Sequence, residues 1–356
     1  MLDFAKECWE IAQQFPRKSP PIPVGHPLIG KIGLCVPGRG FEVQGMTSRA
    51  FNALMKDETR ARNHIQRLKL LKEAGVLTNW DGVLTARAGG YADDRLYRKD
   101  SLTTVANAWS TFYHSTGYPG AGTYANIPTG AVKTNDQTSG FPMTDPGANT
   151  KYLLNFGVQH LTGTNIVMLV DLLVAAGNIL LTSTSPQTVS SAALTRYTDG
   201  VGVMMIFEVT TPSSATACNI TVAYDGTGGT GHTTGAVAFQ TTTAVIQYRL
   251  GPVLPGTGII AMNLQSGDVG VKVVNTFTCS VALGAGVVAL NLYKPLVLIP
   301  TLAVTTFVER STPGMLSGIT ALAKDSGNVL GCLTPFVLTS TTSTGVQTYW
   351  LQSCAG

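Results

Sequence analysis

The glycine-rich stretch GTGGTGHTTG, at positions 226–235, is the first candidate for chemistry, because loops of this composition can hold a phosphate group. The phosphate-loop pattern requires Lys and then Ser or Thr after its last glycine, whereas His232 and Thr233 stand there in this sequence. The stretch also lies between two predicted strands, and a phosphate cradle uses the N-terminus of a helix. We therefore interpret it as a glycine-rich hairpin loop.

Hydrolytic and metal chemistry have few candidate residues. The sequence holds no G-x-S-x-G motif, and its five histidines are far apart, without the spacing of metal ligands. A pair of glycosidase carboxylates, about 5–9 Å apart in space, need not be close in sequence. The acids that could form such a pair are Asp171, Asp199, Glu208, Asp225 and Asp268. Nothing in the sequence selects two of them, so we predict no enzymatic activity, no cofactor and no metal site.

Asp171 is unusual because it stands inside the apolar run MLVDLLV. One interpretation is a buried carboxyl group with a raised pKa at a functional site. The other, which we favour, is a carboxylate at the end of a strand that accepts hydrogen bonds from the backbone or from an arginine.

Aromatic residues gather in a glycine-rich stretch that ends near residue 124. They are Trp109, Phe112, Tyr113, Tyr118 and Tyr124. Such rings could form a platform for sugars, but they equally fill the space between a glycine-rich segment and a sheet. We favour packing over sugar binding.

Short strands separated by turns are predicted for most of the second half of the chain. Residues 219–225 alternate between apolar and polar side chains and end on an Asp-Gly turn signal. Residues 269–273 and 288–293 alternate in the same way, and residues 201–209 are almost continuously apolar, as in a strand covered on both faces. No long helical pattern interrupts residues 180–300. The sequence therefore predicts a mainly β fold, an antiparallel β-sandwich of the jelly-roll or Greek-key kind.

An N-terminal arm of helices and extended chain is predicted to precede this sandwich. Residues 2–15 carry apolar side chains at helical spacing, five prolines between positions 16 and 27 predict an extended connector, and a second helix is expected between Thr47 and Gly75. The apolar side chains that we expect to make subunit contacts are Phe4, Trp9, Ile11, Phe15, Phe51, Leu54, Ile65 and Leu68. The second helix also has a basic face, which could lie on nucleic acid. We favour a packed helix with a solvated basic face, so nucleic acid is not an expected partner.

Charge is distributed unevenly along the chain. Residues 1–100 hold 16 Lys and Arg against 11 Asp and Glu, whereas residues 151–356 hold 7 of each sign. A weakly charged surface promotes association, so this pattern predicts a β-region that is covered by partners. Six scattered cysteines without a C-x-x-C pair predict reduced thiols. Neither a secretory signal nor a membrane span is predicted.

These patterns divide the chain into four parts. Residues 1–75 form the basic helical and extended arm, and residues 76–150 an irregular connector rich in glycine and aromatic residues. Residues 151–310 form the β-sandwich. Residues 311–356 are a C-terminal extension that returns to the sandwich or to a neighbouring subunit.

Part of the chain resembles a loosely characterised group of tailed-bacteriophage virion proteins. The motifs that carry the resemblance are R-Y-T-D-G at 196–200, N-I-T-V-x-Y at 219–224 and L-x-x-G-D-x-G at 264–270. They lie within four stretches of this chain that resemble the phage proteins, and these stretches are residues 194–211, 217–234, 264–280 and 291–300. The resemblance covers roughly residues 150–310 and does not include the N-terminal arm. It implies a structural component of the particle, since its motifs are turn and strand motifs without a catalytic residue.

The sequence and the resemblance together lead to one hypothesis. We expect a head-associated decoration or minor capsid protein, made in the host cytoplasm and located in the virion. Its expected partners are the major capsid protein or neck and tail proteins, together with further copies of itself in a homo-oligomer such as a trimer. The alternatives are a neck, tail or fibre-base component, a jelly-roll shell protein, a module that binds host glycans, and a virion-borne hydrolase of cell-wall sugars.

Overall fold

The computed structural model describes residues 93–355, with gaps at 129, 136–138, 161–162, 164, 190–191, 241–248, 252–260, 302–306, 312–319 and 341–342. The predicted arm over residues 1–75 therefore lies outside the described residues. The same holds for the eight predicted contact residues Phe4, Trp9, Ile11, Phe15, Phe51, Leu54, Ile65 and Leu68. Within the described ranges, no helix is long and apolar enough to cross a membrane.

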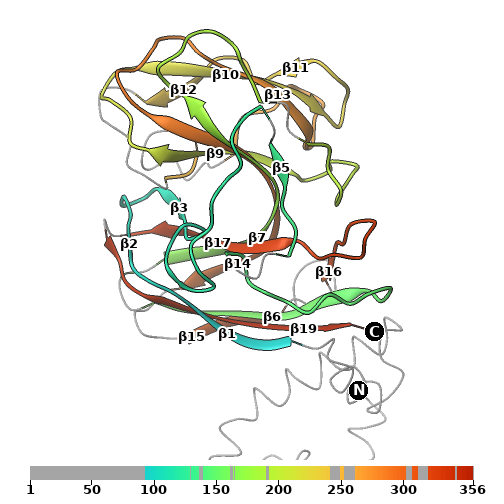
Figure 1. Cartoon of the computed structure of the whole chain (residues 1–356). Helices are drawn as coiled ribbons and strands as arrows, with labels where there is room; N and C mark the ends of the chain where they lie inside the picture. The colour runs from blue at the N-terminus through green and yellow to red at the C-terminus, as the bar shows by residue number, and fades with distance from the viewer. Residues whose placement is uncertain are drawn as a thin grey trace, which may run out of the picture. The chain divides into compact units, whose positions relative to one another are not determined.

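The described chain is built from β-strands, and every pair of strands in its sheets is antiparallel. Figure 1 shows the strands in three layers, which we call the lower, middle and upper sheets. An antiparallel sandwich is thus confirmed for this part of the chain.

The lower sheet brings the first and the last described strands together. Its order is β15 (Phe307–Ser311), β6 (Lys151–His160), β19 (Gln347–Ala355), β1 (Asp93–Lys99) and β4 (Gly117–Tyr118), and β16 (Thr320–Leu322) also pairs with β6. We expected an irregular connector over residues 76–150, yet β1 is a seven-residue strand inside this sheet. A separate two-stranded ribbon joins β2 (Leu102–Thr103) to β18 (Ser343–Thr344).

The middle sheet contains the two longest strands. Its order is β3 (Trp109–Thr111), β17 (Cys332–Thr339), β7 (Asn165–Leu180), β14 (Val287–Thr301) and β9 (Met204–Thr211), and β5 (Ala131–Val132) also pairs with β7. β7 has 16 residues and β14 has 15. Their register shifts at three places, one of them between Pro295 and Val297. A proline cannot donate to its neighbour strand, so a bulge beside Pro295 is where a central strand can accept one.

The upper sheet completes the fold. Its order is β11 (His232–Thr233), β10 (Cys218–Gly226), β13 (Val271–Cys279) and β8 (Gln187–Thr188), and β12 (Val237–Gln240) also pairs with β10. Along β10, the side chains of Ile220, Val222 and Tyr224 are buried, as the alternation predicts.

The hydrophobic core has three parts, and β7 contributes to all of them. Its Val167 and Leu169 pack with the inner face of the lower sheet, whereas its Val174 and Ile179 pack with the upper sheet. The remaining cluster covers the other face of β7, and its members include Trp109, Tyr113, Val170, Leu172, Leu250, Tyr293 and Phe336. Because both faces of the middle sheet are covered, the sequence of its long strand β7 is almost continuously apolar.

Two strand predictions differ from the structure in their limits. The apolar run 201–209 becomes a strand only from Met204, because Gly202 adopts a φ of +65° in a turn, and Val201 there is 47% exposed. In the run 269–273, Val269 is 63% exposed and precedes β13. The pairing of β10 with β13 shifts register twice, which replaces simple alternation in β13 by a different burial pattern.

Candidate functional site

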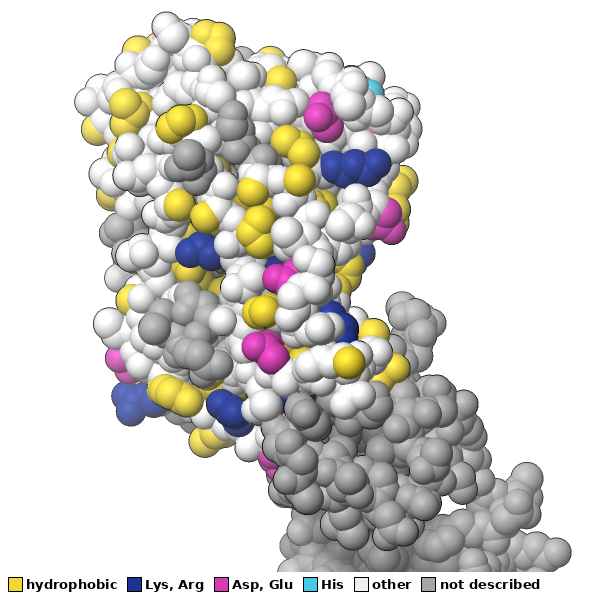
Figure 2. All heavy atoms as spheres, turned by 45° about the vertical axis from the view of Figure 1, so that its right-hand side comes forward, with side chains coloured by type: hydrophobic (Ala, Val, Ile, Leu, Met, Phe, Trp, Pro, Cys, Tyr) yellow, Lys and Arg dark blue, Asp and Glu magenta, His cyan; other side chains and the backbone are white. Residues whose placement is uncertain are grey.

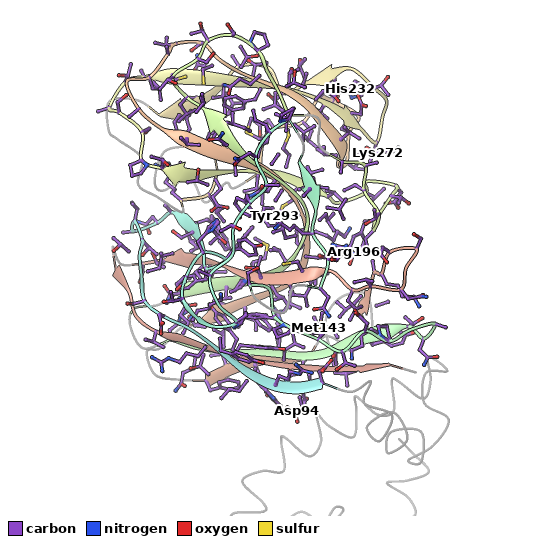
Figure 3. All side chains as sticks on the ribbon, viewed as in Figure 1. Asp94, Met143, Arg196, His232, Lys272 and Tyr293 are labelled. Carbon is purple, nitrogen blue, oxygen red and sulfur yellow. The ribbon has the colours of Figure 1, made fainter. Side chains whose placement is uncertain are left out.

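The R-Y-T-D-G motif supplies the partner of the buried Asp171. Arg196 Nε donates to Asp171 Oδ2 at 3.1 Å and Arg196 Nη2 to Asp171 Oδ1 at 3.0 Å. Both side chains are almost fully buried, and Arg196 Nη2 also donates to the Lys133 carbonyl at 2.6 Å. The favoured interpretation of a carboxylate held by an arginine is confirmed, but Asp171 lies inside β7, not at its end. Figure 3 places Arg196 at the level of the middle sheet.

Burial raises the pKa of Asp171, while the charge and the hydrogen bonds of Arg196 act in the opposite direction. The space around the carboxylate is filled, because a Cβ atom added to Gly331 would lie 2.1 Å from Asp171 Oδ1. Gly331 therefore has to be a glycine while the carboxylate is in place. Such a closed arrangement suits a structural ion pair, since no substrate atom could approach the carboxylate.

The other two motifs meet at Asp268. Tyr224 Oη, at the end of the N-I-T-V-x-Y motif, donates to Asp268 Oδ2 at 2.8 Å. Gly228 N donates to Oδ1 at 2.7 Å, and His232 Nδ1 lies 2.6 Å from Oδ2. Burial acts to raise the pKa of Asp268, but these hydrogen bonds outweigh it and lower the pKa to about 2.

The glycine-rich stretch that first suggested phosphate binding is the loop that Asp268 closes. It connects β10, which ends at Gly226, to β11, which begins at His232, and the two strands pair with each other. This confirms the hairpin interpretation. A Cβ atom added to Gly229 would lie 3.2 Å from His232 Nε2, so the imidazole ring packs closely against this part of the loop.

The first and third motifs also touch each other directly. A Cβ atom on Gly270 would come within 1.9 Å of the Gly200 carbonyl oxygen, which is closer than any side chain allows. Gly202 N donates to the Val269 carbonyl at 2.9 Å beside this contact. The first motif therefore joins the middle sheet, through Asp171, to the turn of the third motif, and the second and third motifs close a turn of the upper sheet.

A second polar cluster is one that the sequence does not reveal. His114 Nε2 lies 2.8 Å from Glu208 Oε1, and Tyr124 Oη donates to Glu208 Oε2 at 2.5 Å. Tyr293 Oη is 3.2 Å from Tyr124 Oη, and Asn291 Nδ2 donates to Tyr293 Oη at 3.1 Å. These residues come from the connector, β9 and β14, so no spacing along the chain could have joined them. Burial is the main cause that raises the pKa of Tyr124 well above its usual value.

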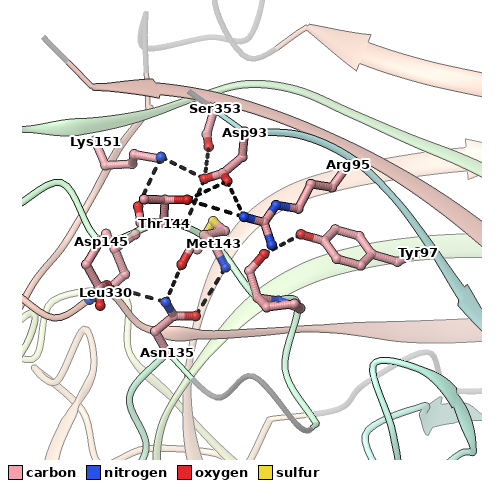
Figure 4. Close-up of polar contacts among 11 residues, drawn as sticks. Asp93, Arg95, Tyr97, Asn135, Met143, Thr144, Asp145, Lys151, Leu330 and Ser353 are labelled. Atoms are coloured by element: carbon pink, nitrogen blue, oxygen red, sulfur yellow. Dashed lines mark hydrogen bonds and ion pairs between the residues drawn. The ribbon is translucent and has the colours of Figure 1, made fainter. Parts of the chain in front are cut away.

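A third cluster lies between the lower sheet and the loop at residue 144 (Figure 4). Lys151 Nζ donates to Asp93 Oδ2 at 2.7 Å, and Thr144 N donates to the same oxygen at 2.9 Å. Arg95 Nη2 lies 3.0 Å from Asp93 Oδ1. Both Lys151 and Asp93 are buried, so each charge depends on the other. Figure 3 shows the neighbouring Asp94 pointing away from the sheet and Met143 between the layers.

The five acids considered for a glycosidase pair are not gathered in one place. Asp171, Glu208 and Asp268 occupy three different clusters, and Asp199 accepts from Val201 N in a turn. Asp225 and Asp268 both accept from the glycine-rich loop, through Gly231 N and Gly228 N. Over the described ranges there is no group of three or more His, Cys, Asp or Glu that could hold a metal ion. The described cysteines with free thiols are Cys218, Cys279 and Cys332.

The aromatic stretch packs, as the favoured interpretation predicts. Trp109, Phe112 and Tyr113 are buried in the core clusters and Tyr124 is partly buried against one of them. Tyr118 is 55% exposed, but a platform for sugars would need several exposed rings side by side.

No family model matches this chain, and no curated protein matches its sequence. Among solved structures, it is similar to the VP2 subviral particle of infectious bursal disease virus, with 11% identity, 75% of this chain and 81% of that chain covered, and a TM-score of 0.18. The T=1 particles derived from the same virus give 10% identity, 74% and 77% coverage and a TM-score of 0.18. Such low scores support no argument about fold or function.

Proposed function

We propose that this protein is a non-enzymatic structural component of a bacteriophage particle, built to make subunit contacts. The observation that carries the proposal is the position of the three resemblance motifs. Arg196, Asp268 and Gly270 hold turns and strands in place through an ion pair, a hydrogen-bonded carboxylate and a close backbone contact. The residues that carry the resemblance to virion proteins therefore hold the scaffold of the fold in place, which supports a structural role.

The surface agrees with a protein that is held by neighbours. The face in Figure 2 carries few charged side chains among many uncharged ones, and residues 151–356 as a whole hold as many acids as bases. Leu96 on β1 and Tyr118 on β4, which are paired strands, are 63% and 55% exposed. Large apolar side chains exposed on one sheet are suited to contact with another subunit.

The position that we propose is the capsid head, as a decoration or minor capsid protein in a homo-oligomer such as a trimer. The partners would be the major capsid protein and further copies of this chain. The N-terminal arm would anchor each copy, and the sandwich, of the jelly-roll or Greek-key kind, would face outward.

Purified particles from infected cells provide the test. We expect quantitative mass spectrometry to find the chain at hundreds of copies per particle, and cryo-electron microscopy to show its three-layered density on the head. A count of roughly six to twelve copies would replace the head position by a ring at the neck or tail. Absence of the chain from particles of full infectivity would refute a structural role altogether.

A host-glycan module is the second candidate, and the structure weakens it. Of the five aromatic residues that suggested it, Trp109, Phe112 and Tyr113 are buried. A glycan array with the purified protein separates the two functions, because a specific signal that is lost in a Tyr118→Ala variant would favour glycan binding.

A further inference from the structure

The hydrogen bonds of His114 define where its protons are. Its Nδ1 atom lies 2.7 Å from the Gly122 carbonyl oxygen, which can only accept, so Nδ1 carries a proton. Its Nε2 atom lies 2.8 Å from Glu208 Oε1. An unprotonated Nε2 would direct its lone pair at a carboxylate oxygen at this distance, and the two atoms would repel each other. One more proton therefore lies between the imidazole and the carboxylate.

The other side of Glu208 is supplied only with donors. Tyr124 Oη donates to Glu208 Oε2 at 2.5 Å, and Asn291 Nδ2 reaches the same oxygen at 3.4 Å. Glu208 is fully buried and the His114 side chain is 11% exposed. The edge of the imidazole ring thus borders solvent, but its Nε2 atom is itself buried, so a proton on Nε2 reaches water only when the ring moves.

The residues around the ring come from five parts of the fold. The titratable and charged groups on these parts are Glu208 on β9, Tyr293 on β14, Lys99 on β1, Arg249 in the segment that pairs with β9, and Tyr113 and Tyr124 in the connector itself. Lys99 Nζ donates to the carbonyls of Ser115 and Gly120, so it also holds the connector in place.

We propose that the His114–Glu208 pair is a pH-dependent latch that fastens residues 112–124 to the middle sheet. In the closed state, the shared proton joins the ring to Glu208. When the pH rises, this proton passes to solvent, and the bare Nε2 atom then faces a buried carboxylate. The attraction becomes a repulsion, and the part of this segment that follows the buried Phe112 and Tyr113 separates from β9 and β14.

The direction of the pH dependence follows from the surroundings of the ring. Burial works to lower the pKa of His114, but the charge of Glu208 and the hydrogen bonds to Glu208 and Gly122 outweigh it and raise the pKa. A folded-state pKa above the unfolded value means that the latch is fully closed below the unfolded pKa and opens as the pH rises through the folded pKa. Opening would release β4, which covers the edge of β1 through the pairs of Arg98 with Tyr118 and of Lys99 with Gly117. Alkaline conditions would thereby uncover a strand edge.

Amide hydrogen exchange of the full chain, followed by mass spectrometry between pH 6 and 9.5 and corrected for intrinsic exchange rates, tests the latch. We expect the protection of peptides within 112–124 to fall by up to about tenfold for each pH unit above the pKa of His114, the limit for one released proton. The protection of β7 and β14 should remain unchanged over the same range. A flat protection profile for 112–124 in the wild-type chain would overturn the proposal.

Two variants and one control sharpen the experiment. His114→Gln retains a donor toward Glu208 but cannot titrate, so the exchange of 112–124 should lose its pH dependence. His232→Gln makes the same change in the other His–carboxylate pair and should leave the wild-type dependence intact. If His114→Gln keeps that dependence, another group controls the segment and the latch is refuted.

A measurement on the unmodified chain guards against variants that fail to fold. The protein has five histidines, so ring-labelled histidine gives few signals in a nuclear magnetic resonance titration. The His114 signal, which is assigned by its loss in His114→Gln or by its contacts with Tyr124, should titrate above the usual histidine pKa. Titration at or below that value would also reject the latch.

Discussion

His160, the last residue of β6, should make the fold sensitive to acid. Its side chain is buried, at 1% exposure, and neither ring nitrogen has a hydrogen-bond partner in the described part of the chain. Burial lowers the pKa of His160 from 6.5 to about 4. The folded protein therefore keeps this ring neutral at pH values where the unfolded chain has already protonated it.

The size of the effect follows from the shift. The unfolded state binds one proton more than the folded state between pH 6.5 and pH 4, so stability is lost as the pH falls through this window. A shift of about 2.5 units at about 1.4 kcal/mol per unit gives roughly 3.5 kcal/mol of lost stability, of which about 3 kcal/mol is lost by pH 4. For a fold with about 5–15 kcal/mol in total, this is a large share.

The assay is urea unfolding at half-unit steps from pH 7.5 to pH 4, with His160→Phe compared to the wild type. Phenylalanine keeps a ring in the core and removes both unpartnered nitrogens, so the difference in free energy of unfolding should grow by roughly 3 kcal/mol in favour of the variant as the pH falls. Phe156→Leu on the same strand is the control, because it weakens the core by a similar amount at every pH. Parallel curves for wild type and His160→Phe would refute the reasoning.

Three further predictions concern the buried polar clusters and the close glycine contact. Lys151→Met should lower the free energy of unfolding in urea by about 3–5 kcal/mol, because it leaves the Asp93 carboxylate buried without its main cation. The double variant with Asp93→Asn should lose less than the sum of the two single variants, and strict additivity would contradict the pairing. Arg196→Met should lower the free energy of unfolding by about 3–5 kcal/mol at pH 7 and by less in acid, because burial raises the pKa of Asp171 and a protonated carboxyl group needs no cation. An equal loss at neutral and acidic pH would show that charge is not the cause. Gly270→Ala should lower the stability measured by thermal unfolding by about 1–3 kcal/mol, because its methyl group meets the Gly200 carbonyl. Gly284→Ala is the control and should be nearly neutral, since its Cβ would lie at an ordinary 3.6 Å from Ser214 Oγ. Equal melting temperatures of the two variants would argue against a rigid contact at Gly270.

The strands of the upper sheet could be predicted because their signals are local. Alternation along residues 219–225 depends on one buried face, and the structure buries Ile220, Val222 and Tyr224 together. The turn after Asp225 is likewise encoded by neighbours in the sequence. Strict alternation does not hold along β13, where the pairing with β10 shifts register between Val271 and Val273 and between Val274 and Thr276, since an extra residue reverses the faces that follow it.

The lower sheet and the polar clusters could not be predicted in this way. β1 and β19 pair from opposite ends of the described chain, and sequence periodicity carries no information on such a partner. The Glu208 cluster joins side chains separated by 84 and 94 positions, as the distances from Tyr124 and His114 along the chain show. Asp171 was recognised as unusual because a charge in an apolar run needs a partner, but only the structure identified Arg196.

The length of β7 and β14 has a mechanical consequence. Each strand packs at one end against the lower sheet and at the other end against the upper sheet. The middle sheet is therefore part of both hydrophobic cores. Unfolding of the lower or the upper sheet would expose apolar side chains on half of β7 and β14, next to the part of these strands that still packs against the remaining sheet. The described region should therefore unfold in a single cooperative step, and a load applied to one end of it would be carried through continuous hydrogen-bonded strands to the far end.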